Sequence, residues 1–559
     1  MRPRPSFPYC RSHIIPSTFS PSFKKTDHSL SQLTNLLSDT TSTLTYNHYK
    51  GSETTRVFPE SFRGAWGKIS ATGTSWVFPF RGVKRAEGGA TGKSRLDPLT
   101  ISTLPDEILL EIFDFCRTES VSGWILVRPV LEWHRLAHVC RRWRQIIFSS
   151  PRRLDLQLIC TYRTPVRKNL RRWPAFPINI DYSTSGNLDS KSLAPYDKSN
   201  VIAALGHPDR VRRVRLSVTK LQLKKIATVM QRPFPALTHL WLSSKDSHVP
   251  ILNAPFLGGS APCLEEICIS GIPFPSLPTL LLSTHDLVVL RLFDIPYNGG
   301  IPPETIVARL AALTKLETLF IEFRGWQLRL QRPPAPPTRS VFPALTTFGF
   351  RGASEYLDDL VAQIDTPRLD DLRVFYIGPM NSQVTQFSQL AQFVSRTADF
   401  KPARFTAARV EFRGNIVYII LDGEQDGRSP SRLTIQMSCI GLDRQVSQVA
   451  RVLAQSSAVL SDVGRLSIGE RVRLPLWRDG MDVEWLELLR PFAAVETLRV
   501  SWWSGWLVAR ALERATGEMV AGVLPALHSL YMEDVPVGAL ERFIAQRKDS
   551  GRTVTMFKS

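Results

Sequence analysis

Only a few residue patterns in this chain resemble sites that could bind a metal ion or perform catalysis. His134 and His138 lie four residues apart, a spacing that puts two imidazoles on one face of a helix and can hold a metal ion. The protease form of this pattern needs a glutamate directly after the first histidine, where this chain has Arg135, and no third ligand follows nearby. We therefore expect a solvated or half-buried helix face and predict no metal site.

The acidic pairs and the glycine-rich stretch do not form sites either. Asp358–Asp359 and Asp370–Asp371 are adjacent residues, so the members of each pair point to different faces instead of converging on one substrate. Residues 87–94 resemble a phosphate-binding loop, but Glu87 stands where its first glycine should be, and Pro98 ends any following helix. The nucleophile elbow and the protein-kinase motifs are also missing. The sequence predicts no catalytic residue, no cofactor and no enzymatic activity.

The composition of the chain limits the classes of protein to which it can belong. The 559 residues are 43% hydrophobic and 9% aromatic, as in folded proteins, and no run approaches the roughly 18 uncharged apolar residues of a membrane span. The seven cysteines form no CxxC pair, so we expect reduced thiols and a cytoplasmic or nuclear protein. The net charge of +20 is typical of nucleic-acid binding, but the basic residues are spread along the chain without an RNA-binding motif. We do not expect direct nucleic-acid or membrane binding.

Two amphipathic helices are predicted between Leu104 and Leu158. In the first, which starts after Pro105, the apolar residues at helical spacing are Ile108, Leu109, Ile112, Phe113 and Cys116. In the second they are Leu136, Val139, Cys140, Trp143, Ile146 and Ile147, with arginines on the opposite side. Two such helices cannot bury both stripes against each other, so they need a further surface from this chain or from a partner.

The sequences LPDEILLEIF (104–113) and VCRRWRQII (139–147) resemble the F-box, the helical module that docks on the Skp adaptor of cullin ubiquitin ligases. By this resemblance the adaptor-facing residues are Leu104, Pro105, Ile108, Leu109 and Ile112. The residues packed inside the module are Phe113, Leu136, Val139, Cys140, Trp143 and Ile146. Pro151–Asp155 replaces the Leu-Trp pair that the family often has, and residues 150–182 are similar to F-box proteins of mushroom-forming fungi. The alternative is an ordinary helical hairpin in a larger domain.

From about residue 178 the chain repeats the frame apolar-x-x-apolar-x-apolar, which is typical of a short strand. The frame begins at Val211, Leu237, Leu264, Leu287, Leu316, Leu345 and Leu369, less regularly at Ala407, and again at Val463, Val495 and Leu527. The first seven starts are 23 to 29 residues apart. Helices are predicted between the strands at 221–230, 305–313, 356–364, 446–453, 483–489, 507–512 and 537–546.

This array is similar to leucine-rich repeats of the irregular class, which implies parallel strands on a concave face and helices on the other side. The Asn or Cys of regular repeats is missing, with Lys245, Ile272 and Ile295 in its place. Residues 416–421 and 433–437 predict two extra strands around a hairpin, so we expect an insertion at about 413–460. One α/β domain with a parallel sheet is the alternative, but the long helices and the glycine-rich turn of that class are absent.

The predicted organisation is α/β with an N-terminal tail. We expect a disordered, basic Ser/Thr/Pro-rich tail at 1–98, an F-box at 99–160, a connecting segment and solenoid edge at 161–200, and a leucine-rich-repeat solenoid at 201–559. The acid-poor start also resembles a transit peptide, but its prolines would break the amphipathic helix that such a peptide needs.

Two segments of the solenoid are candidates for binding a protein. Trp502, Trp503 and Trp506 follow a strand in what we predict to be a turn, where three indoles could form a recognition patch or pack under a loop. Residues 332–339 contain PxxPxR, with Pro334, Pro337 and Arg339, which is either an SH3-type ligand or a stiff connection.

The sequence as a whole therefore predicts a non-catalytic substrate receptor of a Skp–cullin–F-box ligase. The F-box would bind a Skp-type adaptor and through it a cullin, and the repeats would bind an unknown protein substrate. The alternative is a basic repeat scaffold or nucleic-acid-binding protein whose F-box-like hairpin is vestigial.

Overall fold

A computed structural model of the chain describes residues 103–118, 132–151, 153–162, 164–182, 193–246, 249–252, 255–296, 301–325, 338–376, 388–397, 405–423, 431–438, 442–470, 482–515, 522–533, 535 and 537–558. The chain divides into two compact units, residues 1–156 and residues 157–559. The predicted tail (1–98), the 87–94 loop and the prolines of the PxxPxR motif lie outside the described residues.

The first unit contains the two predicted amphipathic stripes, but they form three helices. These are α2 (Asp106–Thr118), α3 (Glu132–Val139) and α4 (Arg141–Ser149). Pro105 precedes the first helix, and its carbonyl accepts a 3.1 Å hydrogen bond from the Leu109 amide. Asp106 and Glu107 lie in the first turn, where negative charge is favourable.

Cys140 separates α3 from α4, where the sequence predicts one continuous helix. It has an extended backbone (φ −152°, ψ 171°), and its Sγ accepts a 3.4 Å hydrogen bond from the Trp143 amide. The helical spacing of the stripe is therefore lost at this residue. Val139 and Cys140, which were expected inside the module, are both exposed, and Val139 is 60% exposed.

The second unit is built on one long sheet, mostly parallel, with 16 strands among the described residues. Its order is β1-β2-β3-β4-β5-β6-β7-β9-β11-β14-β13-β12-β15-β16-β17-β18. The strands are β1 (Leu158–Cys160), β2 (Ile178–Tyr182), β3 (Val211–Ser217), β4 (His239–Ser243), β5 (Glu266–Ser270), β6 (Val289–Ile295), β7 (Thr318–Phe323), β9 (Thr347–Gly352), β11 (Asp371–Tyr376), β12 (Phe405–Arg413), β13 (Ile416–Gly423), β14 (Arg432–Ser438), β15 (Arg465–Glu470), β16 (Thr497–Val500), β17 (Ser529–Met532) and β18 (Thr555–Lys558). Among the described residues the sheet begins at Leu158, before the predicted end of the F-box at residue 160 and before the predicted repeat start near residue 178.

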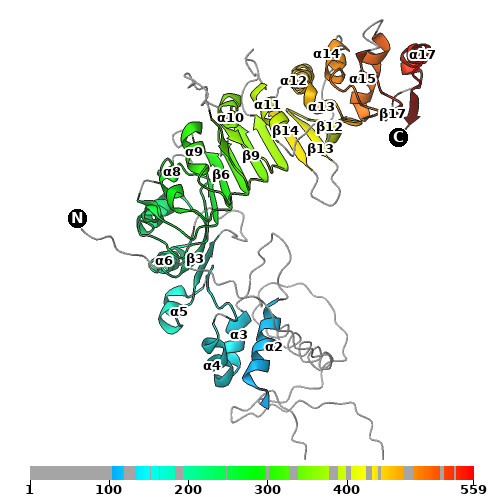
Figure 1. Cartoon of the computed structure of the whole chain (residues 1–559). Helices are drawn as coiled ribbons and strands as arrows, with labels where there is room; N and C mark the ends of the chain where they lie inside the picture. The colour runs from blue at the N-terminus through cyan, green and yellow to red at the C-terminus, as the bar shows by residue number, and fades with distance from the viewer. Residues whose placement is uncertain are drawn as a thin grey trace, which may run out of the picture. The chain divides into compact units, whose positions relative to one another are not determined.

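Helices connect these strands, and Figure 1 shows helices such as α6, α8, α9 and α10 along one side of the sheet. The α-helices are α5 (Val166–Arg172), α6 (Pro195–Leu205), α7 (Lys220–Val229), α8 (Leu277–Leu280), α9 (Pro303–Leu310), α10 (Ser354–Val361), α11 (Ser388–Arg396), α12 (Leu442–Gln455), α13 (Ser457–Leu460), α14 (Asp482–Leu489), α15 (Trp502–Arg514) and α17 (Glu541–Asp549). Short 3-10 helices occur at Phe256–Gly259, Leu281–Ser283 and Val537–Leu540. A second, two-stranded parallel sheet pairs β8 (Ser340–Val341) with β10 (Ile364–Asp365).

The predicted frame marks the core of this unit. In the β4 repeat, for example, Leu237 just before the strand and Leu240 and Leu242 within it are buried, while His239, Trp241 and Ser243 are only half-buried. Alternate strand residues therefore face the helices or the open face of the sheet. The same triad is buried in each of the other regular repeats, which confirms the strand predictions.

The expected insertion is a three-stranded meander built into the sheet. β12 pairs antiparallel with β13, and β13 pairs antiparallel with β14. The outer two strands are parallel to the regular neighbours β15 and β11. Gly414, with φ +59°, forms the β12–β13 turn with Asn415, as the first position of a tight hairpin often requires. In β12 the register shifts between Phe405 and Ala407, so Ala408 is buried instead of the predicted Ala407.

The predicted turn at residues 501–506 is helical. Trp502, Trp503 and Trp506 lie in the first turns of α15, and Ser504 between them is buried. Trp506 is 45% exposed, whereas the side chains of Trp502 and Trp503 lie outside the described residues. The three tryptophans therefore start a helix and do not line a loop.

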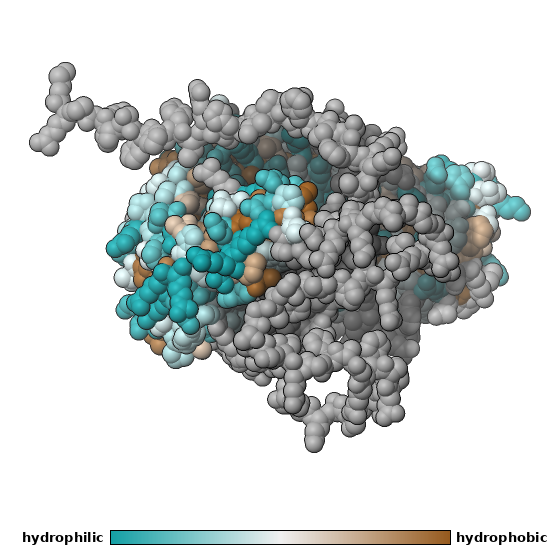
Figure 2. Space-filling model, turned by 90° about the horizontal axis from the view of Figure 1, so that it is seen from below, coloured by the Kyte–Doolittle hydropathy of each residue, from teal (hydrophilic) through white to brown (hydrophobic). Residues whose placement is uncertain are grey.

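The described residues on the face seen in Figure 2 are largely polar. Hydrophilic side chains dominate this face, with hydrophobic residues in small separate patches. Within the described ranges, no helix is long and apolar enough to cross a bilayer.

Candidate functional site

The start of α2 presents three of the residues that the resemblance assigns to an adaptor. Leu104 is half-buried, Pro105 is exposed and Ile108 is 40% exposed. Leu109 and Ile112 are buried. The predicted adaptor-facing set is therefore too large, because these two side chains are not available on the surface of this structure.

Arg142 fixes the beginning of α4 against the beginning of α2. Its Nη2 donates hydrogen bonds of 2.6 Å to both the Asp106 carboxylate and the Leu104 carbonyl, and its Nε donates a 3.1 Å bond to Asp106. Val139 is the last residue of α3 and lies three residues before Arg142 in the sequence. A second ion pair, Arg153 with Glu111, joins the segment after α4 to the middle of α2.

The interior of this unit is built around two aromatic rings. Phe113 and Trp143 pack edge-to-face with their centroids 4.8 Å apart, an arrangement that aromatic pairs favour. Ile146 and Ile147, which follow Trp143 on α4, are also buried, and Leu136 on α3 is half-buried. Of the residues predicted to pack inside the module, Phe113, Trp143 and Ile146 are buried, whereas Val139 and Cys140 are exposed.

The second candidate surface is the open face of the sheet between β3 and β11. One row of aligned positions crosses this face: Arg215, Trp241, Cys268, Arg291, Phe320, Gly349 and Arg373. The Arg215 guanidinium lies 3.9 Å from the centroid of the Trp241 ring, within the range of a cation–π contact. The row combines flat aromatic rings with arginine side chains, both of which are common in protein-binding surfaces.

Carboxylates accompany some of these arginines. Arg291 pairs with Glu266 at 2.7 Å, Arg351 with Glu322 at 2.6 Å, and Arg373 with Asp371 at 2.5 Å. Burial, together with the charge of Arg213, lowers the pKa of His239, so this imidazole is neutral at pH 7. Arg213 and Arg215 add two more arginines on β3, where Arg215 is aligned with Asp181 of β2.

A further aromatic group lies at the other end of the sheet. The Tyr531 and Phe557 rings stack with centroids 4.8 Å apart, and the Arg499 guanidinium lies 4.9 Å from the Tyr531 ring centroid. On α15 the Arg510 guanidinium lies 5.0 Å from the Trp506 ring, and its Nε donates a 2.9 Å bond to Asp482. Trp506 is therefore an exposed ring held by a fixed arginine.

The histidine and aspartate pairs noted in the sequence do not form a metal or catalytic cluster among the described residues. His138 is exposed, the side chain of His134 lies outside the described residues, and Asp358 and Asp359 are buried on α10. Burial raises the pKa of Cys160 and of Cys268 to about 12, so both thiols stay protonated at neutral pH. In the described ranges no group of three or more His, Cys, Asp or Glu side chains could hold a metal ion.

Comparison with known proteins identifies the first unit. The family model F-box-like matches residues 101–157, which cover α2, α3 and α4. No curated protein matches the chain. F-box proteins are typically non-catalytic substrate adaptors, and their F-box domains commonly bind Skp1-type adaptors. The chain therefore carries an F-box-like domain at residues 101–157.

Proposed function

We propose that the chain is the substrate-recognition subunit of a Skp–cullin–F-box ubiquitin ligase. The match of residues 101–157 to the F-box-like family carries this proposal. In such a complex the F-box subunit supplies no chemistry. It holds a substrate lysine close to a ubiquitin-charged carrier, which raises their effective concentration.

The adaptor contact is proposed at the end of the first unit where α2 begins and α3 ends. Ile108 and Val139 are the large hydrophobic side chains exposed in the described part of this unit. Leu104 and Pro105 directly precede α2, and the Leu104 carbonyl accepts a hydrogen bond from Arg142. We propose that these side chains together form an apolar contact with Asp106, Glu107 and Arg142 at its rim, which is the composition of a small protein interface.

The substrate contact is proposed on the sheet of the second unit, which we interpret as a leucine-rich-repeat solenoid of the irregular class. The supporting observations are the buried apolar triads at repeat spacing and the row of arginine and aromatic residues on the open face. A long sheet face offers many aligned side chains to one extended partner. The Tyr531–Phe557 stack extends the candidate surface toward the C-terminal strands, and Trp506 on α15 is a separate exposed aromatic candidate.

Affinity capture of the full-length protein tests the proposal. With the cullin inhibited, wild-type protein should recover a Skp-type adaptor, a cullin and one or more protein substrates, identified by mass spectrometry. Ile108→Asp places a charge in the proposed apolar contact and should lose the adaptor and cullin while keeping substrates. If Ile108→Asp recovers as much adaptor as wild type, the assigned surface is wrong.

A basic repeat scaffold or nucleic-acid-binding protein is the second candidate. The observation in its favour is the charge of +20, together with Arg213 and Arg215 on the open face. Binding to RNA that survives moderate salt, without recovery of an adaptor, would support this function instead.

A further inference from the structure

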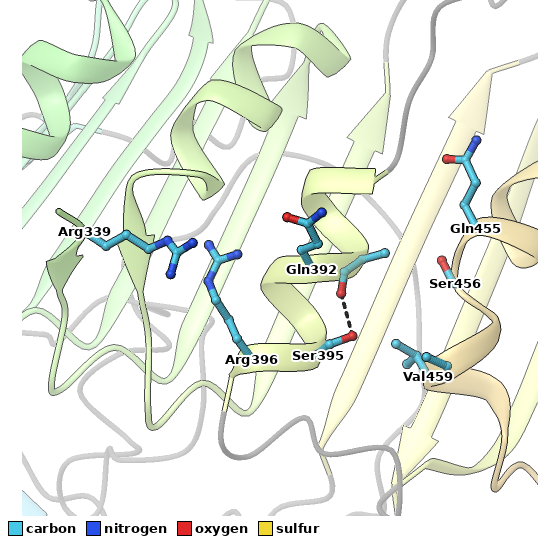
Figure 3. A pocket seen from close by; sticks show the side chains of 9 residues that line it. Arg339, Gln392, Ser395, Arg396, Gln455, Ser456 and Val459 are labelled. Carbon is cyan, nitrogen blue, oxygen red and sulfur yellow. Dashed lines mark hydrogen bonds between the residues drawn. The ribbon is translucent and has the colours of Figure 1, made fainter. Parts of the chain in front are cut away.

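A hollow of about 680 Å³ lies on the second unit between α11 and the α12–α13 segment. Its polar lining comes from Arg339 before β8, from Gln392, Ser395 and Arg396 on α11, and from Gln455 and Ser456. None of the described residues that line it is acidic. Figure 3 shows that the guanidinium groups of Arg339 and Arg396 point toward one another at one end of the hollow.

Arg396 is held in place by the segment that follows α10. Its Nε donates a 2.9 Å hydrogen bond to Asp365, and its Nη2 donates to the carbonyls of Val361 and Ile364, the latter at 3.1 Å. These bonds use one edge of the guanidinium. The hydrogens of its Nη1 have no acceptor among the described residues, so they remain available to a ligand.

Arg339 is anchored to the same segment. Its Nε donates a 3.3 Å hydrogen bond to the Ala362 carbonyl, and the β8–β10 pairing places Ser340 beside Ile364. Its two terminal nitrogens have no described acceptor. Because the anchoring acceptors for both arginines lie between Val361 and Asp365, the two guanidinium groups are brought together before any ligand binds.

The positive charges of the neighbouring Arg339 and Arg396 guanidinium groups repel each other, and the single Asp365 carboxylate does not neutralise both. Burial is the main cause that lowers the pKa of Arg396, and the positive charge of Arg339 lowers it further. Among the described residues, the Asp365 carboxylate pairs with Arg396 alone. An anion with several oxygens between the free edges would relieve the repulsion and accept the remaining N–H groups.

We propose that this hollow binds a phosphate monoester, with Arg339 and Arg396 gripping the phosphoryl oxygens and Gln392 and Ser395 lining its approach. The planar fork of arginine matches phosphate geometry, and the hollow has room for more than a bare oxyanion. The phosphate can be a small free molecule or a phosphorylated side chain of a bound protein. The site is on the helix side of the sheet and does not depend on adaptor binding.

Titration calorimetry on the full-length protein tests this site with two probes, inorganic phosphate and phosphoserine blocked at both ends. Saturable binding of either probe is expected, and Arg339→Gln should weaken it by about tenfold or more, as expected for one charged hydrogen-bonding group. Tighter binding of inorganic phosphate would indicate a free anion as the ligand. Equal or tighter binding of blocked phosphoserine would indicate a phosphorylated side chain.

Two variants make the test specific. Arg232→Gln is the matched control, because this substitution removes the same charge. Arg232 is exposed, follows α7 and does not line the hollow. Arg396→Lys keeps the charge but removes the planar guanidinium, so it should also weaken phosphate binding. Its unfolding temperature is measured separately to detect a loss of stability. The proposal is overturned if neither probe saturates, or if Arg232→Gln weakens binding as much as Arg339→Gln.

Discussion

Cys140 decides which side chains of the F-box-like domain face outward. The apolar spacing from Leu136 to Ile147 predicts one helix, and neither Gly nor Pro interrupts it. Cysteine is not among the usual capping residues, so the sequence offers no sign of the helix break at which the Cys140 side chain caps α4. This is why Trp143 could be predicted as core and Val139 could not.

The Phe113–Trp143 contact should carry much of the stability of this domain. Phe113→Ala removes a buried ring, so we expect a loss of about 3–5 kcal/mol in the free energy of unfolding of the first unit. Hydrogen exchange should show faster exchange in α2 and α4 and unchanged exchange in the sheet of the second unit. Leu221→Ala, at a residue that is 74% exposed, is the control and should change neither. A loss below about 1 kcal/mol for Phe113→Ala would contradict the proposed core.

Asp482 gives the second unit a predictable response to acid. Burial would raise its pKa, but hydrogen bonds and charges from Arg514 and Arg510 outweigh this and hold the pKa below the ordinary value. A carboxyl with a lowered folded pKa stabilises the protein above its unfolded pKa of about 3.9, and this stabilisation is lost as the pH falls toward the folded pKa. Asp482→Asn should therefore destabilise the protein at pH 7 and reduce the loss of stability below about pH 4. Urea unfolding at several pH values measures both effects, and equal pH dependence of the two proteins would contradict the ion-pair assignment.

At the scale of the elements, the repeat frame was the most informative signal. Leu240 and Leu242 in β4, and their equivalents in the other regular strands, are buried as predicted. The positions and lengths of helices such as α7 and α14 also follow the prediction closely. A period-two pattern next to a turn identifies a strand, because only one face of the sheet is covered by helices.

The order of strands in the meander could not be read in the same way. Residues 416–421 and 433–437 were correctly predicted as strands, but nothing local specifies that β14 pairs with β11 and β12 with β15. Strand order depends on contacts between residues that are distant in sequence. The helix that begins at Trp502 also depends on contacts with residues that are distant in sequence. α15 packs closely there, because a side chain at Gly505 would crowd Val535 and the Glu533 carbonyl.

Gly349 tests the packing of the open face. A methyl group at this position of β9 would overlap the ring of Phe320 on the neighbouring strand. Gly349→Ala should therefore destabilise the second unit by about 1–3 kcal/mol, as expected for overpacking. Gly464→Ala is the matched control, because nothing lies within 4 Å of the added carbon there. Thermal unfolding compares the two, and similar unfolding temperatures would show that Phe320 does not occupy this position. Adding Phe320→Leu should recover much of the loss.

At the scale of the whole molecule, the chain combines two units that the sequence distinguished for different reasons. The F-box-like domain was recognisable from the LPDEIL and VCRRWR motifs, and the family match at residues 101–157 agrees with it. The second unit was recognisable only from its periodicity. The sequence could not show that Ile108 and Val139 are exposed while Leu109 and Ile112 are buried. Periodicity shows which residues share an apolar stripe, but it does not show which side of the stripe another helix covers.

The central claim is that the apolar end of the F-box-like domain binds a Skp-type adaptor. Titration of purified full-length protein with a purified Skp-type adaptor tests it most directly, comparing wild type, Ile108→Asp and Leu221→Asp. Both variants place a charge at an exposed apolar residue, but only Ile108 lies in the proposed contact. We predict saturable binding by wild type and Leu221→Asp, and a loss of about thirtyfold or more for Ile108→Asp, the size of an interface hot spot of about 2 kcal/mol. Absence of binding by wild type, or equal affinity of the two variants, would contradict the account.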